Sequence, residues 1–235
     1  MHDDPLSIVA MVSLTVVAYL LARTLYLRYQ HPLGQPVFLG ASIIIATLVV
    51  SGLGFEAYRG AQGVMSWLLG PVTVALAVPV YKQRTHLRAA LVPLTCGLAC
   101  GTAFTTASVL VLAWLARLDS SLFPALAVKS VTAPIAIELA RIQGGDPSLA
   151  AAFAIVTGTL GAMFGPSLLT RLQVTDSVAR GVALGTVSHG QGTAAALLED
   201  ETAGAMSSLA MAGTAAFTAT IAPAYFPLLL WLVAP

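Results

Sequence analysis

Long apolar segments separated by short loops constrain this chain more than any other feature of its sequence. A helix that crosses the hydrocarbon core of a bilayer needs about 20 predominantly apolar residues. Charged residues make up 9% of the 235 residues, whereas soluble domains carry about 25%. We therefore expect an all-α polytopic membrane protein with about seven or eight transmembrane segments, in a single domain over residues 1–235. The candidate segments are Leu6–Ala22, Val37–Leu53, Gly63–Tyr81, Ala89–Leu115, Phe123–Ile142, Leu149–Leu169, Val178–Leu198 and Gly204–Val233.

One of these segments carries charge and a proline in its middle. Lys129–Glu138 reads K-S-V-T-A-P-I-A-I-E. Burying charge at membrane depth is costly, so such residues usually line a site or a water-filled path. Pro134 breaks the preceding helical turn, and the free N–H groups and dipole of a half-helix attract anions. The pattern predicts a broken or re-entrant helix that holds part of a substrate site, formed by Lys129, Ser130 and Thr132.

A second segment is polar at its centre. Gly185–Thr193 reads G-T-V-S-H-G-Q-G-T, and its glycines at 190 and 192 disfavour a continuous helix. Thr193 is a candidate cap for a new half-helix. Unwound backbone is tolerated at this depth only where protein buries it or where it lines a cavity. The substrate-binding candidates in this second break are Ser188, His189, Gly192 and Thr193.

The titratable residues of the two breaks have alternative roles. His189 could bind substrate, titrate in a proton pathway or hydrogen-bond a neighbouring helix. Lys129 and Glu138 could form a structural ion pair across the first break. Alternatively, Lys129 attracts an anion and Glu138 carries a coupling proton.

Two weaker patterns concern packing and symmetry. Residues Pro71–Lys82 and Ser130–Arg141 share Val, Thr and Ala at three matching positions, which predicts an internal repeat of the kind found in transporters. Chance similarity in an alanine- and valine-rich chain competes with this interpretation. Through the repeat, Thr73 becomes a weak candidate for the site. Small residues also recur four apart, a spacing that favours close helix packing within one subunit, at Gly97/Gly101, Gly161/Gly165 and Gly181/Gly185.

The basic residues predict an orientation in the membrane. Arg23 and Arg28 follow the first segment, and Asp3 and Asp4 precede it, so the N-terminus is expected outside. The basic residues split six inside to four outside if all segments cross, and seven to three if Phe123–Ile142 is re-entrant. The charge distribution therefore slightly favours a re-entrant element.

Several classes of function are disfavoured by the sequence. We find no nucleotide-binding loop, GxSxG elbow or metal-ligand triad, so neither an enzyme, a metal site nor a cofactor is expected. A net charge of +1 without a basic face argues against nucleic-acid binding. The acidic N-terminus does not match a secretory signal peptide. Cys96 and Cys100 are expected to be small buried packing residues.

Four blocks of the sequence closely resemble the LrgB/CidB family. They are Gly70–Lys82 (GPVTVALAVPVYK), Lys129–Leu149 (KSVTAPIAIELARIQGGDPSL), Thr157–Leu169 (TGTLGAMFGPSLL) and Ala179–Glu199 (ARGVALGTVSHGQGTAAALLE). The resemblance covers nearly the whole chain from about Leu33 on. The sequence departs from the family at Ala133, where a second Thr is usual, and at Gly190, where Ala is common.

The resemblance implies a multi-pass protein of the bacterial inner membrane. Members of the family are described as antiholin-like regulators of murein hydrolase export, and relatives include a plastid glycolate/glycerate translocator and bacterial pyruvate uptake systems. The resemblance also implies a separate LrgA/CidA-like membrane partner. Our first hypothesis is therefore a secondary transporter of small monocarboxylates, coupled to protons through Glu138 or His189. The alternative is a holin- or antiholin-like regulator of autolysis. A homodimer is the default expectation for its oligomeric state.

Overall fold

The structure, a computed structural model, describes residues 5–29, 31–75, 77–82, 84–85 and 91–233. All regular secondary structure in these ranges is helical, which confirms the prediction of an all-α protein. Contacts divide the chain into two compact units, Met1–Ala77 and Val78–Pro235, which are described separately.

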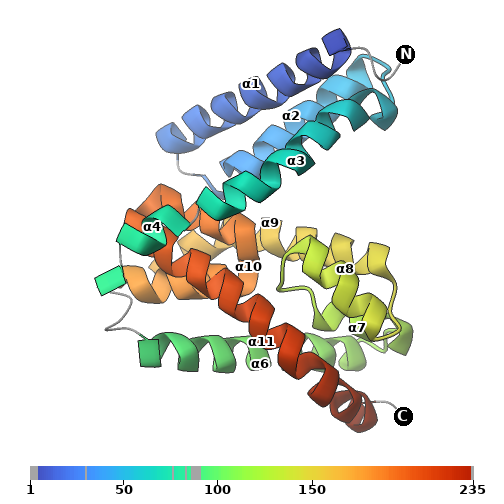
Figure 1. The fold of residues 1–235 in the computed structure, drawn as a ribbon, viewed down its shortest axis with the longest axis vertical. Helices are drawn as coiled ribbons and strands as arrows, with labels where there is room; N and C mark the ends of the chain where they lie inside the picture. The colour runs from blue at the N-terminus through green and yellow to red at the C-terminus, as the bar shows by residue number, and fades with distance from the viewer. Residues whose placement is uncertain (1–4, 30, 76, 83, 86–90, 234–235) are drawn as a thin grey trace. The chain divides into compact units, whose positions relative to one another are not determined.

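The first unit consists of three helices joined by short 3-10 turns (Figure 1). They are α1 (Pro5–Tyr29), α2 (Pro36–Val50) and α3 (Arg59–Ala75). Gln35 caps α2 by accepting a hydrogen bond from the Phe38 amide (2.9 Å). Gly40 of α2 packs against the backbone of α1, since its Cβ position lies 3.6 Å from the Tyr19 Cα, an ordinary van der Waals distance. The Tyr58 hydroxyl bonds Thr15 Oγ1 of α1 at 2.8 Å.

The second unit contains the remaining helices (Figure 1). Three helices of the described residues, α1, α6 and α9, are long and apolar enough to cross a membrane. They support the expected helical membrane protein, whereas the number of crossings stays a prediction. The helices of the second unit are α4 (Ala77–Lys82), α6 (Leu91–Leu115), α7 (Phe123–Ala127), α8 (Ala133–Ile142), α9 (Pro147–Arg171), α10 (Ser177–Glu199) and α11 (Glu201–Val233).

Helix α6 separates a buried stripe from an apolar outer surface. Its buried side chains recur every three or four residues, as on one face of a helix, and are Leu94, Leu98, Thr102, Thr106, Leu110 and Ala113. Other faces expose large apolar side chains such as Val92 and Phe104. This pattern suits a lipid environment. The prediction that Cys96 and Cys100 are buried is wrong, because both are exposed on this outer surface.

The three glycine pairs all lie at contacts between helices of the second unit. A Cβ at Gly97 or Gly101 of α6 would lie 3.5 Å from Val182 or 3.2 Å from Thr186 of α10. The pair Gly161/Gly165 on α9 faces α10, and Gly181/Gly185 on α10 faces the backbone of α11. These contacts confirm that the small residues serve packing within one chain.

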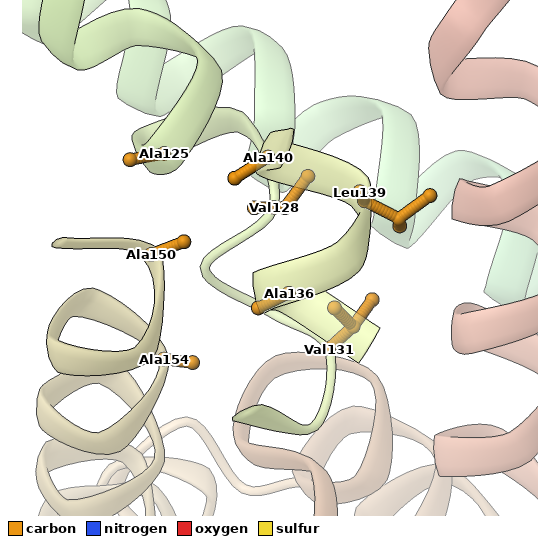
Figure 2. Packing of buried hydrophobic residues seen from close by; sticks show 8 residues of the cluster. All are labelled: Ala125, Val128, Val131, Ala136, Leu139, Ala140, Ala150 and Ala154. Atoms are coloured by element: carbon orange, nitrogen blue, oxygen red, sulfur yellow. The ribbon is translucent and has the colours of Figure 1, made fainter. Parts of the chain in front are cut away.

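The first predicted break forms a hairpin, which we call the first hairpin (residues 123–145). Helix α7 ends at Ala127, the chain is non-helical to Thr132, and α8 then runs back. The two ends meet, since a Cβ at Gly145 would lie 2.6 Å from the Cβ of Pro124. Figure 2 shows the buried cluster that joins this hairpin to α9, made by Ala125, Val128, Val131, Ala136, Leu139, Ala140, Ala150 and Ala154.

Helix α10 also reverses direction, forming the second hairpin (residues 177–200). Arg180 Nε and Nη2 donate to the two carboxylate oxygens of Glu199, at 2.7 and 2.6 Å. In a straight helix these residues would be about 28 Å apart. The reversal lies at His189, whose φ of 41° and ψ of −127° are not helical. The predicted second break is therefore present, and the chain reverses its direction there.

Further hydrogen bonds close the open end of the second hairpin. Ser177 Oγ donates to Asp200 Oδ2 at 2.6 Å, and Asp200 Oδ1 accepts from the amides of Thr202 and Ala203 at the start of α11. Partial burial acts to raise the pKa of Asp200, but these hydrogen bonds and the charge of Arg180 outweigh it and lower the pKa below its ordinary value. Asp200 thus stays ionised and ties the hairpin to α11.

We expect Gly185→Ala to destabilise the protein by about 1–3 kcal/mol, the usual cost of overpacking. The new Cβ would overlap the Ser207 carbonyl oxygen and lie 2.8 Å from the Ala210 Cβ, forcing α10 and α11 apart. Gly63→Ala on α3 is the matched control, because no heavy atom lies within 4 Å of its Cβ position. Thermal unfolding in detergent micelles compares the two, and equal stability would contradict the packing argument.

Candidate functional site

His189 occupies the tip of the second hairpin and points to α9. Its side chain is buried, and its Nε2 lies 3.0 Å from the Ala154 carbonyl oxygen. A carbonyl can only accept, so Nε2 carries the hydrogen, and in the neutral ring Nδ1 keeps a lone pair. The positive φ of His189 places it in a backbone region that L side chains rarely adopt. Such outliers concentrate at functional sites.

Gly192 and Thr193 hold this tip in place. A Cβ at Gly192 would overlap the Leu184 carbonyl oxygen, so the reversal requires glycine there. Thr193 Oγ1 donates to the His189 carbonyl oxygen at 3.0 Å and therefore accepts from Ser207 Oγ, also 3.0 Å away. Thr193 thus fixes a carbonyl of the turn. The prediction that its side chain caps the N–H groups of a half-helix is wrong.

Several buried polar atoms of the second unit have no hydrogen-bond partner among the described residues, and those of Thr186, Ser188 and Gln191 belong to the second hairpin. Ser188 is 1% exposed, and its Oγ lies against Gly161 of α9, where a Cβ would overlap it. In lipid, such atoms need a partner, which water or a ligand can supply. Sequence reasoning missed most of these residues, although hydroxyl and amide groups inside apolar segments were the available signal. Within the described residues, the atoms without a partner are Thr102 Oγ1, Gln143 Nε2 and Oε1, Thr186 Oγ1, Ser188 Oγ, Gln191 Oε1 and Thr214 Oγ1.

The tip of the first hairpin combines a lysine, a buried serine and a helix start. Lys129 Nζ donates to Ser130 Oγ at 3.1 Å, and Ser130 is buried. Thr132 is the N-cap of α8, yet its side chain makes no capping bond. Pro134 supplies no N–H, and the amides of Thr132 and Ala133 find no acceptor among the described residues. The predicted free N–H groups are therefore present beside Lys129.

Glu138 does not join this tip. It is exposed on α8 and pairs with Arg141 one turn later, at 3.0 Å. The alternative of a Lys129–Glu138 ion pair across the break is therefore wrong, because Glu138 pairs with the residue three positions later on its own helix.

Helix α9 brings the two tips together at Ala154. The Ala154 side chain belongs to the same buried cluster as Val128 and Val131 of the first tip. Its carbonyl oxygen accepts the hydrogen bond from His189 of the second tip. Figure 2 shows Ala154 on α9 facing Ala136 of α8. The structure thus gathers candidates from both breaks around one turn of α9.

Two other expectations concern Thr73 and metal binding. Thr73 belongs to α3, but its side chain lies outside the described residues. In the part of the chain that the structure describes, no group of three or more His, Cys, Asp or Glu side chains could hold a metal ion.

We expect His189→Gly to be more stable than His189→Ala by about 1–2 kcal/mol. Both variants lose the hydrogen bond to Ala154, but only glycine adopts the positive φ without strain. At Val187, which is helical, the same pair should show the opposite order, with alanine favoured by about 1 kcal/mol. Thermal unfolding in micelles measures all four variants, and alanine being favoured at both positions would exclude a strained turn at His189.

Comparisons with known proteins find relatives that match most of this chain. It is 35% identical over 224 residues to the uncharacterised protein YxaC of Bacillus subtilis, covering 95% of this chain and 96% of the relative. It is 32% identical over 210 residues to the uncharacterised protein YwbG of the same organism, covering 89% and 93%. The holin-like protein CidB of Staphylococcus epidermidis is 29% identical over 221 residues, covering 94% and 96%.

No solved structure matches the chain. The sequence model of the LrgB-like family matches residues 15–228, which include both hairpins and α9. The resemblance inferred from the sequence motifs is therefore confirmed, and the chain belongs to the LrgB-like family.

Proposed function

We propose that this chain performs a holin-like function in the membrane, the function after which its staphylococcal CidB relatives are named. The observation that carries this proposal is their similarity from end to end, over 94% of this chain and 96% of the relative. Such extensive similarity supports a shared architecture. The apolar outer surface of α6 and the length of α1, α6 and α9 support action within the bilayer.

A second candidate function is a secondary carrier of small monocarboxylates such as glycolate, glycerate, pyruvate or lactate. The juxtaposition of the two hairpin tips at Ala154 favours it. A pore assembled from several chains needs no polar helix breaks buried within each chain, whereas carriers bind their substrates between broken helices. Neither candidate function involves enzymatic chemistry.

In the carrier, each tip would supply a different kind of group. Lys129 and the free amides of Thr132 and Ala133 would attract the carboxylate, with the hydroxyl groups of Ser130 and Thr132 beside them. Ser188 would add a hydroxyl from the second tip, where its Oγ has no partner among the described residues. Gly192 and Thr193 would act by shaping that tip.

Proton coupling in the carrier would depend on His189 or Glu138. The Nδ1 lone pair of His189 could accept a proton while Nε2 keeps its bond to Ala154. Glu138 is exposed at 61% of its side chain and pairs with Arg141, so as a coupling residue it would act at the edge of the first hairpin.

The proposal includes the surroundings of the protein. We place it in the bacterial inner membrane with its N-terminus outside, as a homodimer that works with an LrgA/CidA-like membrane partner. The lipid-facing surface of α6 is consistent with a multi-pass protein, and the partner comes from the resemblance of the sequence to its family.

Reconstitution into liposomes separates the two functions. One set of vesicles measures uptake of radiolabelled glycolate, pyruvate and lactate, with and without an inward proton gradient. A second set, loaded with a self-quenching dye, measures release. Both sets contain this chain alone or with the partner. Dye release without saturable uptake supports the holin-like function, whereas saturable uptake with retained dye establishes the carrier. Neither activity, from protein that remains monodisperse, would contradict both.

If the chain is a carrier, Lys129→Met should reduce uptake by about 30-fold or more, since losing the contact of the half-buried Lys129 charge with the carboxylate costs about 2 kcal/mol or more. Methionine keeps the length of the side chain and removes its charge. Lys82→Met is the matched control, because Lys82 is an exposed lysine paired with Glu201. Uptake that falls equally in both variants would show that Lys129 has no special role.

A further inference from the structure

We propose that the first and second hairpins enter the bilayer from opposite faces, and that each forms the barrier between its own face and the polar site at the tips. The topology is a property of the fold alone. The barrier role rests on the carrier function proposed above.

The open end of the second hairpin has the composition of a membrane surface. Arg180 pairs with Glu199 there, with side chains 13% and 22% exposed. Arg180 also donates to the carbonyl oxygens of Val174 and Pro166, at 2.8 and 3.1 Å. Such a charged network is costly inside hydrocarbon and stable where water reaches it. By contrast, the tip of this hairpin at Ser188 and His189 is buried.

The open end of the first hairpin has the same character. Its ends meet at Pro124 and Gly145. The exposed pair Glu138–Arg141 lies on the last turns of α8, and Asp146 caps α9 by accepting from the amide of Ser148 at 2.7 Å. The tip of this hairpin, around Val128 and Ser130, is buried instead.

Helix α9 connects the two open ends and sets them on opposite faces. It begins just after the first hairpin and ends just before the second. Its 25 residues span about 37 Å, more than the hydrocarbon core of about 30 Å. Ala154 lies about 10 Å from the start of α9 and about 25 Å from its end. The two tips therefore approach Ala154 from opposite directions.

Helices α6 and α11 agree with this arrangement. Helix α11 begins at Glu201, directly after the second hairpin, and Glu201 pairs with Lys82 at 3.1 Å. Near the start of α6, a Cβ at Gly97 would lie 3.5 Å from Val182, close to the open end of the same hairpin. Further along, α6 packs on the first hairpin, where Thr106 Oγ1 donates to the Ala127 carbonyl oxygen. Ala113, near the end of α6, shares a buried cluster with Phe123 at the start of the hairpin. Each hairpin therefore extends from its open end at one face of the membrane to its tip beside the polar site.

Cysteine labelling of the full-length protein in sealed vesicles tests the topology. Cys96 and Cys100 are first replaced by alanine. Single cysteines are then placed at exposed positions flanking each hairpin: Ser121 and Ser148 for the first, Thr175 and Glu201 for the second. A membrane-impermeant maleimide is applied to right-side-out and inside-out vesicles, and labelling of denatured protein sets the maximum.

We expect Thr175→Cys and Glu201→Cys to be labelled from one face, and Ser121→Cys and Ser148→Cys from the other. Labelling of Thr175→Cys and Glu201→Cys from opposite faces would make α10 a full crossing and overturn the proposal. Labelling of all four from one face, or of none, would also overturn it. This readout needs no transport, so it stands whatever the uptake assay shows.

The barrier role is tested at the tip of the second hairpin with Ser188→Cys. A small cationic thiol reagent applied from the face of the second hairpin should react about tenfold faster when Glu199→Gln is added, because charge-assisted bonds of the closure are lost. Glu138→Gln is the matched control, since it weakens the ion pair of the other hairpin. An unchanged rate with Glu199→Gln, or the same increase with Glu138→Gln, would overturn the barrier role and leave the topology standing.

Discussion

The rest of the structure depends on the need to bury or bond every polar backbone group at membrane depth. Both hairpins interrupt helices where lipid could not satisfy the freed groups, and α9 lies against both interruptions. Its alanine side chains pack on the first hairpin, and its Ala154 carbonyl takes the ring of His189. Because glycine faces α10 at 158, 161 and 165, the second hairpin approaches closely enough to exclude lipid from its tip.

Among the described residues, this close approach leaves the Ser188 hydroxyl without a hydrogen-bond partner. Ser188 Oγ lies against Gly161 of α9, which offers no side chain to bond. The glycine contact at this point thus gives tight packing and a polar atom whose hydrogen-bonding capacity is unused. A soluble core would rarely retain this combination.

Much of the fold could be predicted from the sequence, because lipid imposes simple rules of length and polarity on helices. The predicted segments correspond to helices, and Pro134 and the glycines at 190 and 192 marked the two breaks. The reversal at His189 could not be predicted, since a positive φ in a residue with a side chain is imposed by tertiary contacts. Of the two alternatives left open for Glu138, the ion pair with Lys129 is excluded because Glu138 pairs with Arg141 on the same helix. Cys96 and Cys100 were expected to be buried because lipid-facing and buried positions are equally apolar.

The distribution of polar groups bears on how the molecule could move a solute. On α6, the exposed surface carries side chains such as Val92, Phe104 and Leu112, while the hydroxyl groups of Thr102 and Thr106 face inward. Assembly of several chains through such apolar surfaces would give a pore with an apolar wall. The buried polar groups, in contrast, would serve a path within one chain, between hairpins whose tips share Ala154. The two candidate functions therefore depend on different parts of the molecule. A holin-like pore would depend on its apolar outer surface, whereas a carrier would depend on its polar interior.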